Sequence, residues 1–537
     1  MDTDTSPTTS SPDTALAPAA PRPYGALSGV LAAASAVAVG EVTAALVPAW
    51  PGPVVAIADR VIEGAPAALT AWAIDTFGTA DKPLLVAGVL VVLALAAAAL
   101  GVLARRRPGL ALVGVVALGA VAALAGLADP GFGPAAAVPG LAAIVPGVAV
   151  LLVLTAAQAR LGVAGAGPGV GREHGPAGGS ADPGRRRFLV LAAAVAAGAA
   201  ATGTAARVLL ARFDVEAARA ALTLPAPSAR RDLPAPPDAA LDVAGATPLF
   251  TPNDAFYRID TALQVPRIDP ATHRLQVTGM VERPLSLRVD DLLRRDLVEV
   301  PITMACVSNE VGGDLIGNAA WLGLPLRELL DEAGVSPDAD QVVGRSTDGY
   351  TGGFPVAAAY DRDTLVVVGM NGEPLPAEHG FPLRLVTPGL YGYVGSTKWL
   401  AEIELTRFDR FDHYWVPRGY AVEAPVRTQS RIDVPAGRSE LTAGRTPIAG
   451  VAWAPTRGIA QVEVQVDDGD WQPAELAAAV GDDTWRQWVL RWDATPGSHR
   501  IRVRATDGRG ETQPEGRRGV RPDGATGWHT VTVEVAA

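Results

Sequence analysis

The chain has 537 residues, a formal net charge of -11 at pH 7 and a mean hydropathy of +0.22, so it is long enough for several domains. The negative balance argues against a nucleic-acid partner, because phosphate binding needs a basic face. The single cysteine excludes a disulfide framework within the chain, and this residue is either core packing or is kept for its chemistry.

The N-terminal part is predicted to be membrane-embedded. Residues 1–23 are rich in Pro, Ser and Thr, which predicts disorder. Within residues 24–211, five apolar stretches approach the roughly 20 residues that a spanning helix needs. The segment 53–77 carries several charges and is interpreted as an interfacial or loop helix. The five predicted spans are Ala26–Pro48, Leu84–Ala104, Gly109–Ala128, Ala136–Ala157 and Phe188–Leu210.

Two arginine triplets predict the orientation of these spans. Arg105–Arg107 separate the second span from the third, and Arg185–Arg187 precede the fifth. Basic loops stay in the cytoplasm, so both triplets face inward if the N-terminus does. The residues after the fifth span then lie outside, which predicts a multi-pass protein of the cell membrane. The run Gly184–Leu189 resembles a twin-arginine export signal, although an ordinary positive-inside anchor fits it equally.

The soluble part divides into a linker and two domains. Residues 212–248 contain many prolines and are predicted to form a stiff, extended spacer. Residues 249–425 mix short strands with short helices, which predicts an α+β domain. In residues 440–537, alternating runs such as Ala460–Val466 and Thr530–Val535 predict an immunoglobulin-like β-sandwich. The α+β domain has expected strands at Arg274–Val281, Thr364–Met370, Leu383–Thr387 and Glu402–Arg407, and helices at Val289–Arg295 and Leu326–Ala333.

The cysteine lies where a cofactor could approach. A strand-like run ends at Cys306, and small or polar residues follow up to Gly313. Glycine-rich backbone leaves room for a bulky group beside a thiolate. Thiolate is a soft ligand that suits a transition metal.

Several motifs, in order across about 180 residues, resemble the molybdopterin domain of the sulfite oxidase family. The resemblance covers the soluble half, where residues 440–537 are similar to that family's dimerisation domain. The matching segments begin with Thr251-Pro252-Asn253 and Phe256-Tyr257, and continue with Cys306–Asn309, Trp321–Leu326, Met370–Pro376, His379–Arg384 and Ser396–Trp399.

This resemblance implies an enzyme with a molybdenum-molybdopterin cofactor and two-electron oxygen-atom transfer. Cys306 would be the metal ligand, and Tyr350 would face the substrate. A homodimer through the sandwich is implied as well. Because the predicted spans contain no histidine for a membrane haem, electrons would pass to a separate carrier or a quinone-linked membrane subunit. The pterin and its phosphate would be held by Asn253, Phe256, Tyr257, Ser346, His379, Arg384, Ser396 and Lys398.

The pattern departs from the family just after Cys-x-x-Asn. Sulfite oxidases have arginines there, whereas this chain has Glu310 and Val311. A carboxylate at that position would repel sulfite. An arginine elsewhere could compensate, because Arg258 and Arg345 lie near positions that match the family's sequence. We therefore expect a small neutral substrate, such as a sulfoxide, in preference to sulfite.

Two other functions fit parts of the sequence. Cys306 and His379 could form the nucleophile and base of a hydrolase. The chain could instead be a five-span sensor or adhesion protein whose sandwich binds a partner.

Overall fold

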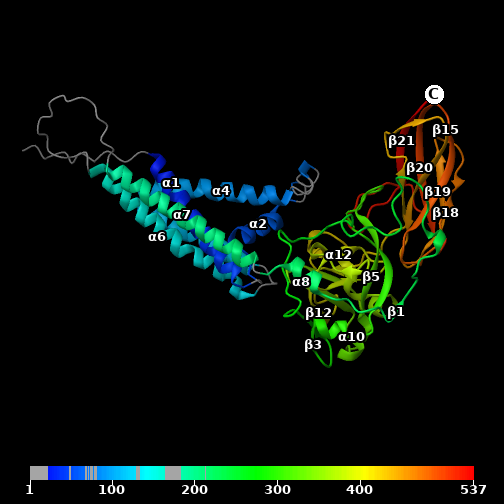
Figure 1. Cartoon of the computed structure of the whole chain (residues 1–537), viewed down its shortest axis with the longest axis horizontal. Coiled ribbons are helices and arrows are strands. Elements are labelled where there is room, and N and C mark those ends of the chain that lie inside the picture. Colours follow the sequence, from blue (N-terminus) through cyan, green and yellow to red (C-terminus); the bar gives the residue numbers. More distant parts are fainter. Residues whose placement is uncertain are drawn as a thin grey trace, which may run out of the picture. The chain divides into compact units, whose positions relative to one another are not determined.

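The computed structural model describes residues 22–47, 50–66, 81–128, 133–163, 183–211 and 213–537, with single positions between 69 and 77. The predicted disordered N-terminus lies, up to residue 21, outside the described residues. The chain forms two compact units, Met1–Arg212 and Phe213–Ala537, and each is considered by itself (Figure 1).

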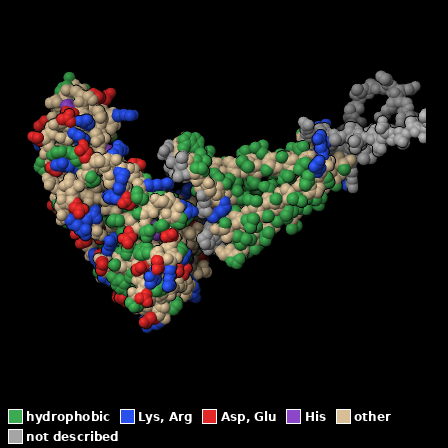
Figure 2. All heavy atoms as spheres, turned by 180° about the vertical axis from the view of Figure 1, so that it is seen from behind, with side chains coloured by type: hydrophobic (Ala, Val, Ile, Leu, Met, Phe, Trp, Pro, Cys, Tyr) green, Lys and Arg blue, Asp and Glu red, His purple; other side chains and the backbone are tan. Residues whose placement is uncertain are grey.

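The N-terminal unit consists of apolar helices. Ala, Leu, Val and Gly occupy nearly every turn, so these helices are apolar on all sides, as expected in lipid. Figure 2 shows apolar side chains over the visible face of this unit. Among the described residues, five helical segments are long and apolar enough to cross a membrane, and each overlaps one predicted span. The long helices are α1 (Arg22–Ala45), α4 (Asp81–Ala104), α5 (Pro108–Leu127), α6 (Val138–Val163) and α7 (Pro183–Ala211), and the shorter α2 (Pro53–Gly64) lies in the expected 53–77 segment.

Glycine allows α1 and α4 to pack closely. A Cβ atom added to Gly29 would lie 1.8 Å from the backbone oxygen of Ala97, and one added to Gly101 would lie 2.1 Å from that of Gly25. Small residues at both sides of a crossing let two backbones approach, which is the common way that apolar helices associate in lipid.

The first part of the C-terminal unit contains two sheets. Successive residues of β8 point to opposite faces, so Val366 and Val368 enter one core while Leu365 and Val367 enter another. The first sheet has the order β1 (Ala229–Arg230), β4 (Val298–Ala305), β5 (Ile316–Pro325), β8 (Leu365–Met370), β10 (Arg384–Val386) and β11 (Ser396–Thr397), with β9 (Glu373–Pro374) beside β8. The second has the order β3 (Leu285–Arg288), β2 (Arg274–Gly279), β12 (Leu400–Thr406), β6 (Gln341–Ser346) and β7 (Thr351–Pro355).

Short helices accompany these strands, and two of them, α9 (Val289–Leu293) and α10 (Leu326–Ala333), lie where the sequence predicts helices. α10 ends at Gly334, whose φ of +70° is the left-handed conformation that commonly terminates a helix. The connecting helices are α8 (Val215–Ala221), α9 (Val289–Leu293), α10 (Leu326–Ala333), α11 (Val356–Asp361) and α12 (Gly392–Gly395).

Two further sheets form the C-terminal part. The alternating positions predicted from the sequence, including Val462, Val464, Ile501 and Val503, are fully buried in one core. One sheet has the order β13 (Gln429–Val434), β15 (Gly444–Trp453), β19 (Arg486–Ala494) and β18 (Glu475–Leu476). The other has the order β14 (Glu440–Thr442), β21 (His529–Ala536), β20 (Gly497–Asp507), β16 (Ile459–Val466) and β17 (Gln472–Pro473).

The proline-rich segment, which the sequence predicts to be a stiff and extended spacer, also pairs with other parts of the C-terminal unit. Its strand β1 pairs in parallel with β4, and Ser228 N donates to Leu297 O at 2.7 Å. Further along, Asp238 O accepts from Ala478 N at 3.0 Å. Prolines fix an extended backbone, but the other residues keep N–H and C=O groups that pair with an open sheet edge. The segment therefore runs along both parts of the C-terminal unit.

Candidate active site

Cys306 begins a tight loop at the end of β4. Its backbone N–H donates to Leu315 O at 2.9 Å. This hydrogen bond lies at the point where β4 and β5 separate. Asn309 closes the loop, because its N–H donates to Cys306 O at 3.0 Å and its Oδ1 accepts from Leu315 N at 3.0 Å. The Ser308 N–H lies 3.4 Å from the cysteine Sγ. Thus Asn309 of the Cys-x-x-Asn motif shapes the loop, while Cys306 carries the chemistry.

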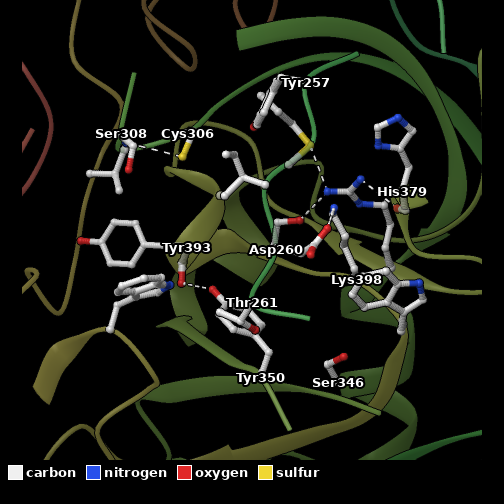
Figure 3. Close-up of a pocket in the computed structure, with 18 of the residues that line it drawn as sticks. Tyr257, Asp260, Thr261, Cys306, Ser308, Ser346, Tyr350, His379, Tyr393 and Lys398 are labelled. Atoms are coloured by element: carbon white, nitrogen blue, oxygen red, sulfur yellow. Dashed lines mark hydrogen bonds and ion pairs between the residues drawn. The ribbon is translucent and has the colours of Figure 1, made fainter. Parts of the chain in front are cut away.

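The thiol lies in the wall of a pocket of about 850 Å³ that opens to solvent. Figure 3 shows Cys306, Tyr350 and Lys398 around this cavity. Asn253 does not line it, and instead its backbone oxygen lies 3.1 Å from Nε2 of His379. The other nine predicted site residues all line it: Phe256, Tyr257, Cys306, Ser346, Tyr350, His379, Arg384, Ser396 and Lys398.

One end of the pocket is basic and buried. Arg384 on β10 donates to His379 O at 3.0 Å and to Ser396 Oγ at 2.7 Å, and only 3% of the residue is exposed. Lys398 Nζ donates to Asp260 at 3.1 Å. Burial lowers the pKa of Arg384 to about 10 and that of Lys398 to about 8, because water no longer solvates the charges. Both groups remain cations near neutral pH.

Polar atoms at this end lack partners in the protein. Burial, with help from Arg384 and Lys398, lowers the pKa of His379 to about 3, so its imidazole is neutral. Among the described residues, nothing hydrogen-bonds its buried Nδ1 or the buried Nε of Arg384. Buried polar atoms are normally paired, so this end is built to receive a polar ligand.

The opposite wall is aromatic and uncharged over most of its area. The Tyr350 hydroxyl donates to Tyr393 O at 2.8 Å, and burial holds the Tyr350 pKa well above its usual value. Trp415 and Tyr420 complete the wall, with ring centroids 5.2 Å apart. Sequence reasoning missed Tyr393, Trp415 and Tyr420 because they lie outside the family motifs and no periodic pattern marks them.

The arginines considered as compensation do not line the pocket. Arg345 points to Glu404, with an Nε–Oε2 distance of 2.8 Å, and its guanidinium lies over the Phe411 ring. Arg258 pairs with Asp260 at 3.0 Å. Glu310 is exposed and absent from the lining, so its predicted effect on an anion is not direct. The loop around Cys306 turns this side chain outward.

The cysteine hydrolase is not supported by the geometry. The sulfur contacts Ser308 N and the His379 Nε2 contacts Asn253 O, so within the described structure the two side chains share no hydrogen bond. Burial also raises the pKa of the Cys306 thiol, which is opposite to the activation that a nucleophile needs.

Comparisons with known proteins identify the family. The model for the oxidoreductase molybdopterin binding domain matches residues 262–415. The mitochondrial sulfite oxidase of Mus musculus is 31% identical over 345 residues, which cover 53% of this chain and 62% of that protein. The uncharacterized oxidoreductase YuiH of Bacillus subtilis is 33% identical over 152 residues, which cover 28% of this chain and 74% of that one. The chain belongs to the sulfite oxidase family of molybdopterin oxidoreductases.

This sulfite oxidase family member is therefore an oxidoreductase enzyme with a molybdenum-molybdopterin cofactor. It spans 62% of the length of the mouse enzyme. The crystal structure of the sulfane dehydrogenase SoxCD from Paracoccus pantotrophus is similar over 57% of this chain and 89% of that one, at 25% identity and a TM-score of 0.48.

The residues of the pocket fit this cofactor. A pterin phosphate is anionic, and Arg384 and Lys398 offer charge-assisted donors to it. Among the described residues no carboxylate contacts Arg384, whose hydrogen-bond partners are His379 O, Ser396 Oγ and the Met304 sulfur. The unpaired ring nitrogen of His379 and Nε of Arg384 are suited to the polar edges of a pterin.

Proposed function

We propose that Cys306 is the protein ligand of molybdenum and that the basic end of the pocket holds the pterin and its phosphate. The observation that carries this proposal is the arrangement of residues around one cavity. The only cysteine of the chain lines the same cavity as two cations, and two of the lining residues, His379 and Arg384, carry a buried polar atom that no described residue hydrogen-bonds.

Each remaining site residue has a defined position for this role. Arg384 and Lys398 present donors at the phosphate end, whereas His379, whose Nε2–H donates to Asn253 O, has only its neutral Nδ1 left as an acceptor. Ser396 Oγ accepts from Arg384, and Ser346 lines the same pocket. The rings of Phe256 and Tyr257 stack at 5.1 Å between centroids and provide a flat wall for the pterin. Asn253 acts indirectly, since its backbone oxygen orients the His379 ring.

The bound cofactor supplies two-electron oxygen-atom transfer, while the chain supplies orientation and the electrostatic environment. Tyr350 remains protonated because burial raises its pKa, and its single O–H would turn from Tyr393 O to an oxygen of the bound substrate. The rings of Tyr393, Trp415 and Tyr420 exclude water from that side. These side chains would hold the substrate next to Cys306.

The aromatic wall favours a small neutral substrate, such as a sulfoxide, over sulfite. Among the described residues that line the pocket, the cations Arg384 and Lys398 are both at the buried end, and Asp348 lies on the side of Tyr350. An anion there loses hydration without gaining a paired cation. The exposed Arg521 lies outside the lining, with its guanidinium 5.1 Å from the Tyr420 ring centroid, and offers only a screened attraction at the rim.

We also infer the cellular arrangement from the sequence. The two arginine triplets and five spans favour a multi-pass protein with the active site outside the cytoplasm, and the run Gly184–Leu189 fits twin-arginine export. The domain limits proposed are residues 24–211, 212–248, 249–425 and 440–537. The last domain would be an immunoglobulin-like sandwich that forms a homodimer. Electrons would go to a separate carrier or a quinone-linked membrane subunit.

The test uses the full chain produced in cells that make the cofactor. We expect about one molybdenum atom per chain, and turnover of a small sulfoxide at a higher kcat/KM than of sulfite. Cys306→Ala should abolish turnover while circular dichroism stays that of the parent chain. A folded, metal-free parent chain would overturn the proposal, and full activity of Cys306→Ala would overturn the assigned ligand.

A further inference from the structure

The loop that carries Cys306 is held from outside its own domain. We propose that the C-terminal sheets, through Arg431 and His529, position this thiolate loop, defined as Cys306–Leu315. Both are positioning residues, since they touch the backbone of the loop and line no part of the pocket. The effect on the metal rests on the proposed role of Cys306, whereas the positioning itself does not.

Arg431, on β13, holds the loop through a guanidinium group whose three nitrogens each donate a hydrogen bond. Its Nη1 donates to Gly313 O at 2.8 Å, across 118 residues of sequence. Its Nη2 donates to Thr247 Oγ1 at 2.8 Å, and its Nε donates to Asp433 at 2.7 Å. Only 11% of the Arg431 side chain and 9% of the Asp433 side chain are exposed. A planar fork fixed at three points defines the position of the Gly313 carbonyl far better than a flexible ammonium would.

His529, on β21, fills the other side of the loop. A Cβ atom added to Gly312 would lie 2.2 Å from Cδ2 of His529, so the imidazole packs directly against the loop backbone. The ring is fixed in turn because its Nδ1 accepts a hydrogen bond from Ile432 N at 3.0 Å. Burial and the nearby Arg431 lower the pKa of His529 to about 4, which keeps Nδ1 available as an acceptor at neutral pH.

β4, the strand that leads to Cys306, is also hydrogen-bonded to residues of the C-terminal part of the unit. Thr303 N donates to Asp483 O at 2.9 Å, and Thr303 Oγ1 accepts from Trp485 N at 2.7 Å. Cys306 therefore lies between two anchors, one at Thr303 and one at Gly312 and Gly313. Rigid support on both sides is what holds a functional group in its productive orientation.

The conformation of the loop affects the cysteine sulfur through the backbone N–H of Ser308. Its N–H lies 3.4 Å from Sγ of Cys306, at a distance that depends on the loop conformation. A hydrogen bond to a coordinating thiolate withdraws charge from the sulfur, and such contacts tune the metal to which it binds. Loosening the loop at Gly313 should therefore change the electronic environment of a bound metal as well as the exposure of the free thiol.

The experiment measures the exposure of Cys306 in the full chain purified without cofactor. Because the chain has one cysteine, the rate of alkylation by iodoacetamide reports on this residue alone. We expect Arg431→Met to raise the rate about tenfold, since losing one charge-assisted hydrogen bond lowers the free energy of opening by about 1.4 kcal/mol. Arg431→Lys, which can keep one donor near Gly313 O, should give an intermediate rate.

A second variant separates positioning from a general loss of stability. His529→Asn can keep an acceptor for Ile432 N while it removes the ring from Gly312, and it should also speed alkylation. The control is Arg491→Met, which removes an exposed arginine on β19 that pairs with Glu475 at 2.6 Å and has no described contact with the loop. This control should keep the parent rate. If Arg431→Met does not fold, His529→Asn decides the question.

The cofactor-loaded chain provides the spectroscopic readout. Arg431→Met and His529→Asn should shift the molybdenum electron paramagnetic resonance signature and the reduction potential, while Arg491→Met should not. Parent alkylation rates in both folded loop variants would overturn the positioning role. Fast alkylation in a chain that never binds molybdenum would instead overturn the proposed function and leave the positioning role intact.

Discussion

The hydroxyl of Tyr350 donates a 2.8 Å hydrogen bond to the backbone oxygen of Tyr393, and both residues line the pocket of Cys306. Tyr350 precedes β7, whereas Tyr393 is on α12, so the bond links two segments across the cavity mouth. This bond fixes the Tyr350 ring before any substrate arrives. To assist a substrate, the ring can stay in place while the single O–H rotates from Tyr393 O to the substrate oxygen.

Tyr350→Phe should therefore lower kcat/KM by about a hundredfold, at the lower end of the range for the loss of one positioned donor. The loss of the bond to Tyr393 O should cost only about 1 kcal/mol of stability. Steady-state kinetics and thermal unfolding would measure the two effects. Tyr360→Phe on α11, away from the pocket, is the matched control and should keep the parent kcat/KM. Equal losses in both variants would contradict a role for Tyr350 in the site.

Arg384→Met should separate cofactor binding from folding. The cation is buried without a carboxylate partner among its described contacts, so its removal should change the stability of the cofactor-free chain little. The molybdenum and pterin content of chain made in cofactor-producing cells should fall at least about tenfold, as expected when a charge-assisted phosphate donor is lost. Elemental analysis and pterin fluorescence after oxidative release would measure it. Full cofactor content would contradict the assignment of the basic end.

His529 should make the unfolding of the cofactor-free chain depend on pH. Its folded-state pKa of about 4 lies below the ordinary value of 6.5, so between these values the unfolded chain binds a proton that the folded chain does not. Stability is therefore retained above pH 6.5 and falls as the pH drops toward 4, by at most about 1.4 kcal/mol per pH unit for this one group. Urea midpoints followed by tryptophan fluorescence in detergent should show a shallower fall for His529→Asn. The same slope in both chains would contradict it.

The sequence predicts the parts of the site that lie in continuous motifs. His379, Arg384 and Lys398 were predicted because they lie in the segments His379–Arg384 and Ser396–Trp399 that resemble the family's motifs. The apolar spans and α10 were predictable because each follows one local pattern of hydropathy. Such patterns depend only on neighbouring residues.

The rest depends on contacts between distant segments. The pairing of the proline-rich segment was not predicted, because its composition indicates stiffness but not the edge of β4 beside which it lies. Trp415 and Tyr420 reach the pocket only after the chain has passed through β12. Likewise, nothing near Arg431 in the sequence indicates that its partner is the carbonyl of Gly313.

The contact between Gly312 and His529 allows a double-mutant test of the loop. Gly312→Ala alone should speed Cys306 alkylation strongly, because the new Cβ would lie 2.2 Å from the imidazole and the backbone φ is +82°. Adding His529→Asn should relieve the clash with the ring but not the cost of about 1 kcal/mol for alanine in a left-handed conformation. The double variant should thus be alkylated more slowly than Gly312→Ala, yet still faster than the parent chain. Strictly additive effects on the logarithm of the rate would mean that the two residues are not coupled, and would place the ring elsewhere than against the loop.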